Sequence, residues 1–309
     1  MKRLAAAILA TAASGLLLAS PAAAHHPFDG EGRYFPWSLP PMVLTMTGLA
    51  LVLFIHGMWR LRRRGRSDLA GWDRLVLFVA GLTVIVLALA SPLDPIGEEY
   101  LLSAHMFQHM ALVDLGPALL LLAVRGPLLF FILPAAILGP IARTSWVRTA
   151  LGFLVKPAVA IVIWCAVFAF WHVPSLYQRA IQDGILHDLE HISYLIAGLL
   201  IWTVLIDPAQ HNRVRRSVRI GTAVVVFAAG QILSEILLFS SKIYYPLYEL
   251  QPDRLFGISA LTDQRYAGAI MMIEQALAIG TFMLVFFLLE DQSDRRRYAE
   301  NASEIGPIA

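Results

Sequence analysis

The chain alternates between long apolar runs and short polar segments, and the runs are long enough to cross a bilayer. A helix of about 20 apolar residues spans the hydrocarbon core. Seven runs approach that length, so the pattern predicts an all-α integral membrane protein with about seven transmembrane helices. The predicted spans are residues 40–59, 75–91, 101–124, 157–173, 186–206, 220–240 and 267–289.

A further apolar stretch, residues 128–142, does not fit the same pattern. It is short, and Pro127, Pro134 and Pro140 fall within or beside it. Proline removes a backbone donor and interrupts helices. We therefore expect a broken or interfacial segment here, not an eighth span.

The N-terminus has the pattern of an export signal. Lys2 and Arg3 precede the apolar residues 4–18, and Ala22-Ala23-Ala24 gives a small-residue cleavage pattern. An uncleaved first membrane helix is the alternative. The expected organisation is a signal peptide at 1–24, an outer segment at 25–39, a membrane domain at 40–290 and a tail at 291–309.

Basic residues are distributed unevenly between the two sets of connecting loops. Seventeen of the 24 lysines and arginines fall in one set of loops or in the C-terminal tail, and five fall in the other set. Because positive charge accumulates in cytoplasmic loops, the mature N-terminus is predicted outside and the C-terminus inside. The expected location is the cytoplasmic (inner) membrane of a bacterium.

Composition agrees with a protein whose main surroundings are the lipid bilayer. Hydrophobic residues make up 58% of the chain and charged residues 15%, where soluble domains carry about 25%. Disorder, a coiled coil and nucleic-acid binding are therefore not expected. Cys165 is the single cysteine, which excludes an intrachain disulfide and a cysteine-based zinc site.

Histidines are the main candidate chemistry, because five of the nine fall at similar depth in three predicted helices. Two pairs have i, i+4 spacing, which places both rings of a pair on one helix face. Neutral imidazole is a ligand for copper, zinc and iron. A hydrogen bond between helices is the alternative for any single histidine. The predicted metal ligands are His105, His109, His172, His187 and His191.

Other side chains are candidate additional ligands or supporting groups. Glu190 neighbours the second pair, and it either hydrogen-bonds a ligand histidine or faces the lipid headgroups. Asp263 and Gln264 precede the seventh span, where closing the site and capping the helix are equally expected. Met106, Met110 and Met271 suit soft Cu(I) or simple packing.

Two more groups at the outer side have separate interpretations. His25 and His26 begin the predicted mature chain, where a free amine and an imidazole can chelate Cu(II); a flexible tail is the favoured alternative. Tyr244, Tyr245 and Tyr248 are typical of an interfacial aromatic belt.

Several of these stretches together resemble the multi-span CtaG family of membrane cytochrome c oxidase assembly factors, associated with caa-type oxidases. The matching segments are SPLD (91–94), HMFQHM (105–110), WHVPSLY (171–177), HDLEHISYLIAGLLIW (187–202), YYPLY (244–248) and DQRYAGAIMM (263–272). They occur in the family's order.

The resemblance implies a role in maturing a haem–copper terminal oxidase, with copper delivered or inserted at the outer face. Expected partners are cytochrome c oxidase subunits and a soluble copper chaperone outside the membrane. The histidine positions, with Asp263 and Gln264, match the family's polar motif positions. Their assignment as copper ligands comes from spacing and depth.

The chain departs from the family pattern at two acidic residues. Glu235 in the sixth span and Glu274 in the seventh are expected to be buried carboxylates in the outer half. A buried carboxylate must be paired, protonated or bound to a metal. These two residues indicate either a variant site for a harder metal or a proton-linked step.

Three other functions remain open from the residues alone, although the protein is not expected to be an enzyme. Facing histidines could bind haem b. Three histidines holding zinc, with Glu190, Glu235 or Glu274 as general base, would suit an intramembrane hydrolase. Asp114 near mid-membrane suggests a metal transporter, but no polar path continues inward.

Overall fold

The computed structural model describes residues 37–38, 40–209, 214–252 and 254–305, with side chains up to residue 286. The predicted signal peptide at 1–24 and the outer pair His25 and His26 lie outside the described residues. Most of the outer segment at 25–39 also lies outside them. For the tail at 291–309, helical backbone is described as far as residue 305.

The described residues form helices and no strands. Six helical stretches are long and apolar enough to cross a membrane, and a bent pair raises the number to seven if it counts as one span. The prediction of an all-α membrane protein is therefore confirmed. The six are α2 (Pro41–Arg63), α3 (Trp72–Ala90), α5 with α6 (Leu102–Met110 and Gly116–Ala123), α12 (Gly184–Ile206), α13 (Arg216–Phe239) and α15 (Ala260–Ile305).

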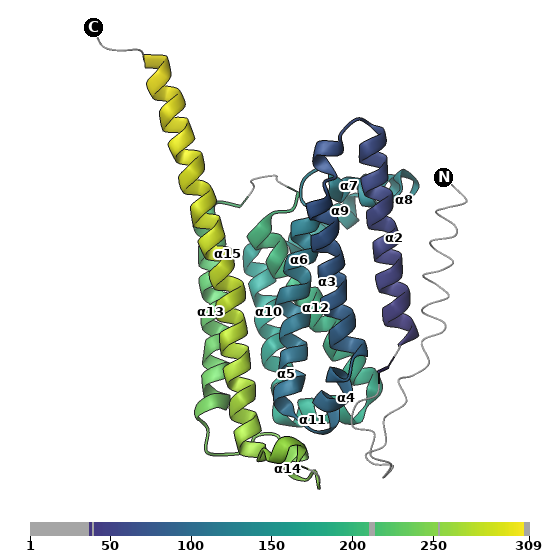
Figure 1. Cartoon of the computed structure of the whole chain (residues 1–309), viewed down its shortest axis with the longest axis vertical. Coiled ribbons are helices and arrows are strands. Elements are labelled where there is room, and N and C mark those ends of the chain that lie inside the picture. Colours follow the sequence, from purple (N-terminus) through teal and green to yellow (C-terminus); the bar gives the residue numbers. More distant parts are fainter. Residues whose placement is uncertain (1–36, 39, 210–213, 253, 306–309) are drawn as a thin grey trace.

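These helices pack as a bundle with an antiparallel α13–α15 pair at one side and α2 at the other (Figure 1). Between them, α5 and α6 pack against α3, α12 and α15. Short helices cover the two ends of the bundle. One end carries α7 (Leu128–Ile132), α8 (Ala135–Arg143) and α9 (Ser145–Leu154), and the opposite end carries α4 (Leu93–Glu99), α11 (Pro174–Gln182) and α14 (Pro246–Glu249).

We call the first of these the arginine end, because Arg60 to Arg66 lie there, and the second the histidine end. The broken character of residues 128–142 is confirmed, since α7 and α8 are separate short helices. Arg60 stabilises the end of α7 by donating to the carbonyls of Phe131 and Leu133, at 2.9 and 2.8 Å. The arginine therefore has a packing role in addition to its predicted effect on orientation.

The fourth predicted span is shorter than expected. Helix α10 (Pro157–Trp171) has 15 residues and rises about 22 Å, which is less than the ~30 Å hydrocarbon core. Together with α9 it forms the bent pair, with an angle of 67° between the two helices. The break falls at residues 155–156, just before Pro157, where a regular helix cannot continue.

The helix of the seventh span begins before its predicted start at residue 267, where Asp263 and Gln264 were expected to precede it. Helix α15 starts at Ala260, seven residues before the predicted start, and the Ser259 hydroxyl accepts from the backbone N–H of Thr262. Asp263 and Gln264 therefore lie in its first turns. Their polarity did not mark a loop, because both side chains are buried against other elements.

A π turn, labelled η2 (Ala111–Leu115), interrupts the third span between α5 and α6. Pro117 follows it, and a proline can neither donate to nor pack closely on the carbonyl four residues earlier, which belongs to Val113. Gly198 of α12 lies against this carbonyl, so closely that a Cβ atom would be 2.1 Å from the oxygen. The proline and the close helix contact together account for the local change of helix type.

Candidate functional site

The two i, i+4 histidine pairs face each other across the α5–α12 seam near the histidine end. His105 and His109 belong to α5, and His187 and His191 belong to α12. The ring centroids are 5.3 Å apart for His105 and His187 and 5.4 Å apart for His109 and His191. As predicted, the i, i+4 spacing places both rings of each pair on one helix face. The two faces meet, so all four rings lie close together.

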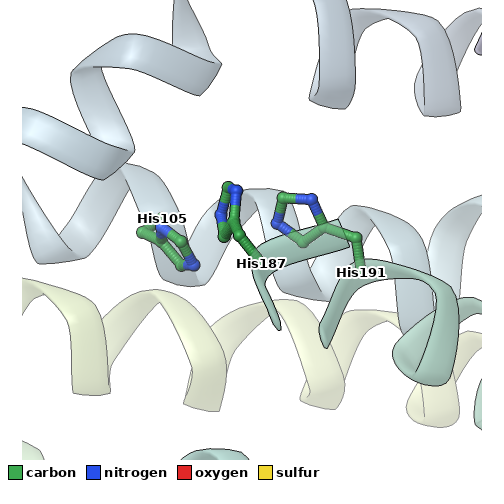
Figure 2. Close-up of side chains that lie close together, drawn as sticks. All are labelled: His105, His187 and His191. Carbon is green, nitrogen blue, oxygen red and sulfur yellow. The ribbon is translucent and has the colours of Figure 1, made fainter. Parts of the chain in front are cut away.

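Figure 2 shows three of these rings, His105, His187 and His191, clustered between their helices. His105 and His109 are fully buried, and His187 and His191 are 7% and 6% exposed. Neither ring nitrogen of His105 or His109 has a hydrogen-bond partner among the described residues, and the same holds for Nε2 of His187 and His191. Buried polar atoms are normally satisfied, so this set of free nitrogens marks a site that can accept a ligand.

Glu190 completes the cluster. Its side chain is fully buried, so the alternative in which it faces lipid headgroups is wrong. One carboxylate oxygen lies 3.6 Å from Nε2 of His109 and the other 3.9 Å from Nε2 of His105. Neither oxygen has a hydrogen-bond partner among the residues with described side chains.

The donor atoms fall into two overlapping groups of three. In one, the atoms of His105, His187 and His191 all lie within 4.8 Å of one another, and in the other those of His105, His109 and Glu190 do. The first group offers three nitrogen donors and the second offers two nitrogens and a carboxylate oxygen, and both kinds of donor bind copper or zinc. His105 belongs to both.

Glu98 is a functional candidate that sequence reasoning missed. Nδ1 of His187 donates to its carboxylate at 2.8 Å, which directs the free Nε2 into the cluster. Glu98 lies on α4, in a segment that the hydropathy pattern treats as a connection between spans. The signal that could have found it is Gly97, where α4 approaches α5 so closely that a Cβ atom would be 2.9 Å from the Cα of His105.

Asp94 supports the same region from the first turn of α4. Its carboxylate accepts from Nε2 of Gln108 at 2.6 Å, and the same nitrogen donates to the carbonyl of Ala88 at 2.8 Å. Burial, together with the nearby charge of Glu98, raises the pKa of Asp94 above its usual range. The contact ties α4 to the helix that carries His105 and His109.

His172 is close to the cluster but belongs to neither group of three. It is the residue that follows α10, and its Nδ1 donates to the carbonyl of Phe168 at 2.7 Å. The hydroxyl of Tyr194 lies 3.3 Å from that nitrogen, and the ring of Tyr194 is 4.4 Å from the ring of His109. The structure thus places His172 beyond Tyr194, with Nε2 buried and without a partner among the described residues.

The tyrosines assigned to an aromatic belt are mostly interior, so that prediction is wrong. Tyr245 and Tyr248 are buried. Tyr248 donates to the carbonyl of Gly97 at 2.6 Å and lies 2.6 Å from the hydroxyl of Tyr177, whose ring is 5.3 Å from that of His105. These side chains close the histidine end of the cluster because their hydroxyl groups find partners there.

The side chains of Asp263 and Gln264 form hydrogen bonds with the backbone of neighbouring segments. Asp263 accepts from the N–H groups of Leu102 and Ser103, at 2.7 and 3.2 Å, and so caps the start of α5 from another helix. Gln264 accepts from the N–H of Tyr244 at 2.7 Å. The expected helix cap is present, but the capped helix is α5, not the one that contains the aspartate.

The remaining predicted groups are distributed elsewhere. Met106, Met110 and Met271 are buried in the apolar core. Glu235 is exposed on the outside of α13, so the prediction that it is a buried carboxylate is wrong. Sequence depth alone could not show which face of the helix it occupies. Glu274 is partly buried, with one oxygen that lacks a partner among the residues with described side chains.

Comparisons with known proteins give one family. The model of the family described as cytochrome c oxidase caa3 assembly factor (Caa3_CtaG) matches residues 52–289, a range that includes both histidine pairs, Glu98 and Glu190. Searches against curated proteins and against solved structures found no match.

Proposed function

Because this chain belongs to the cytochrome c oxidase caa3 assembly factor family, we propose that it binds a copper ion between α5 and α12 and passes it to the oxidase. In this role copper is the cargo of the protein and not a resident cofactor. The oxidase subunit that receives it is the proposed partner. A soluble chaperone outside the membrane is the proposed source.

The observation that carries this proposal is the set of buried donors without partners. Four imidazoles and one carboxylate converge, and six of their ring nitrogens and both carboxylate oxygens lack hydrogen bonds within the part of the chain that is described. Leaving buried polar atoms unpaired is costly. A bound cation would satisfy several of them at once.

The contact between Glu98 and His187 supports a metal over a simple hydrogen bond between helices. A metal-ligating histidine usually donates its second ring N–H to a carboxylate or carbonyl, which fixes the tautomer and strengthens the ligand nitrogen. Nδ1 of His187 makes this kind of contact at 2.8 Å, and its Nε2 is left for the ion.

The position of the cluster supports delivery on the outer side. It lies near the histidine end of the bundle, opposite the end that carries the arginine-rich loops (Figure 1). Since arginine-rich loops favour the cytoplasm, the cluster would open towards the outside, where a copper chaperone could reach it.

Metal analysis of the detergent-purified chain, with its visible spectrum, tests the proposal. We expect about one copper ion per chain after anaerobic Cu(I) loading, because the convergent imidazoles suit that ion. The variant His105→Ala should lose it. His56→Ala is the matched control, since His56 lies on α2, outside the cluster.

Other results would overturn copper binding. A Soret band would indicate haem b instead. Failure of the wild-type chain to retain copper would make the histidines structural, and equal copper in wild type and His105→Ala would place the metal elsewhere.

A zinc-dependent hydrolase is the second candidate, and the position of Glu190 favours it. Zinc held by His105, His187 and His191 would leave a fourth position for water. Glu190 is buried beside these ligands and could serve as the general base. Zinc as the only metal, together with a hydrolytic activity that disappears in Glu190→Gln, would replace the copper proposal with this one.

A further inference from the structure

We infer that the centre selects between two copper positions by oxidation state: Cu(II) binds His105, His109 and Glu190, and Cu(I) binds His105, His187 and His191. This inference rests on the proposed copper binding. In this inference Glu190 is a ligand of Cu(II) but not of Cu(I), so its carboxylate determines which oxidation state binds beside the α5 histidines.

The two groups differ in charge and hardness although they share His105. One offers three neutral nitrogens, and the other offers two nitrogens and a carboxylate. Coulomb attraction to a carboxylate is twice as large for a doubly charged ion as for a singly charged one at the same distance. Oxygen donors also suit harder ions. Cu(II) therefore gains more than Cu(I) from Glu190.

The geometry around Glu190 suits an ion shared with the α5 histidines. Its two oxygens lie 3.6 and 3.9 Å from the Nε2 atoms of His109 and His105. Two ligand atoms that each lie about 2 Å from one ion are separated by about 3 to 4 Å. The observed separations are of this size, and no other partner among the described residues competes for the oxygens.

The group of three nitrogens is prepared differently. Glu98 accepts from Nδ1 of His187 and so holds its Nε2 free for an ion. The carboxylate stays behind the ring, where it orients the ligand without entering the ion's coordination shell. A singly charged ion with three neutral imidazoles needs no further negative ligand.

His105 allows both positions to exist within one fixed pair of helices. Neither of its ring nitrogens has a hydrogen-bond partner within the described part of the chain, so the ring is not committed to one group. It lies 4.2 Å from the His109 ring and 5.3 Å from the His187 ring. An ion can therefore change its other ligands while it keeps this one.

Paired affinity measurements on the full-length chain in detergent test the inference. Cu(II) affinity is measured by competition and electron paramagnetic resonance, and Cu(I) affinity by anaerobic competition with a chromogenic chelator. For Glu190→Gln we expect Cu(II) affinity to fall at least about tenfold more than Cu(I) affinity, which raises the one-electron reduction potential by about 59 mV for each factor of ten.

Glu98→Gln is the matched variant, because it removes the charge of the other carboxylate and keeps its size. We expect Cu(I) affinity to fall more than Cu(II) affinity in this variant, since Glu98 supports the group of three nitrogens. Equal losses of both oxidation states in Glu190→Gln would overturn the selection while leaving copper binding intact. Absence of copper in both states of the wild type would overturn the proposed function itself.

X-ray absorption of the wild-type protein gives a test that depends on no variant. Imidazole produces a characteristic scattering pattern, so histidine ligands can be counted in each oxidation state. Three imidazoles in the Cu(I) form and two in the Cu(II) form are expected. The same number in both forms would contradict a change of position.

Discussion

The two halves of the seam between α5–α6 and α12 differ sharply in chemistry. Towards the histidine end, the seam contains four histidines and Glu190. Towards the arginine end it is lined by apolar side chains, and Asp114 with Trp202 marks the boundary. The buried apolar residues of that second half include Leu121, Ala123, Ile201, Val204 and Leu205.

This contrast favours a binding site at one end of the bundle over a path that carries ions across it. A cation moving across the bundle would need donors along the whole seam, because a charge in an apolar interior is costly. Within the described part of the seam, the convergent groups that could hold a metal gather in the histidine half. The arrangement favours an ion that enters and leaves on the same side, which agrees with the proposed delivery to an oxidase.

The largest effect is expected from His105→Ala, because it removes a donor from both groups of three. Copper retention should fall to background, whereas Asp114→Asn at the boundary between the halves should leave it unchanged. Metal content after desalting measures both. Substantial copper loss in Asp114→Asn would erase the distinction between the halves.

Glu98→Gln should have the next largest effect. Loss of an outer carboxylate behind a ligand histidine typically lowers metal affinity by about 10- to 100-fold. The control is Glu249→Gln, since Glu249 is an exposed carboxylate on α14 at the same end of the bundle. Competition titrations measure both variants, and equal affinities for the two would argue that the contact with His187 has no functional role.

Gly198→Ala should destabilise the fold at the boundary between the halves. The added methyl group would meet the Val113 carbonyl of the π turn, and such overpacking costs about 1 to 3 kcal/mol. Thermal unfolding in detergent should show a lower midpoint. Gly221→Ala on α13 has open space around the new Cβ and should change little, so similar midpoints for the two variants would count against close contact at Gly198.

Trp202→Phe should have the smallest effect. It removes the indole N–H that donates to Asp114 at 3.0 Å, and a typical hydrogen bond of this kind contributes about 0.5 to 1.5 kcal/mol to stability. The unfolding midpoint should fall while copper retention stays at the wild-type level. A loss of copper here would show that the two halves are coupled.

The sequence predicted most of the helices because the bilayer sets the length of each apolar run, whichever way the helices pack. It also predicted that His105, His109, His187 and His191 would gather, since i, i+4 spacing fixes a helix face. What it could not supply was contacts between distant segments. Glu98 reaches His187 from a short helix, and Asp263 caps α5 from 160 residues away.

Helix faces were the other unpredictable element. Glu235 and Glu190 are both acidic residues within predicted spans, yet one is exposed on α13 and the other is fully buried. Depth along a helix was predictable for both. The direction of each side chain depends on which neighbour covers that face, and a single span's sequence does not encode its neighbours.

The π turn at Ala111–Leu115 has a consequence for how this helix can be edited or transplanted. A π turn holds one residue more than an α turn, and each residue advances a helix by about 100°. The histidine face of α5 and the apolar face of α6 therefore follow two rotational phases. Deleting one residue at the turn would convert it to an ordinary α turn and leave both faces directed as they are, whereas regular α geometry at full length would rotate the α6 face by about 100° relative to the histidines. If the residues of α5 and α6 formed one uninterrupted α-helix, that helix could direct either the histidines or the apolar face toward a given neighbouring helix, but not both.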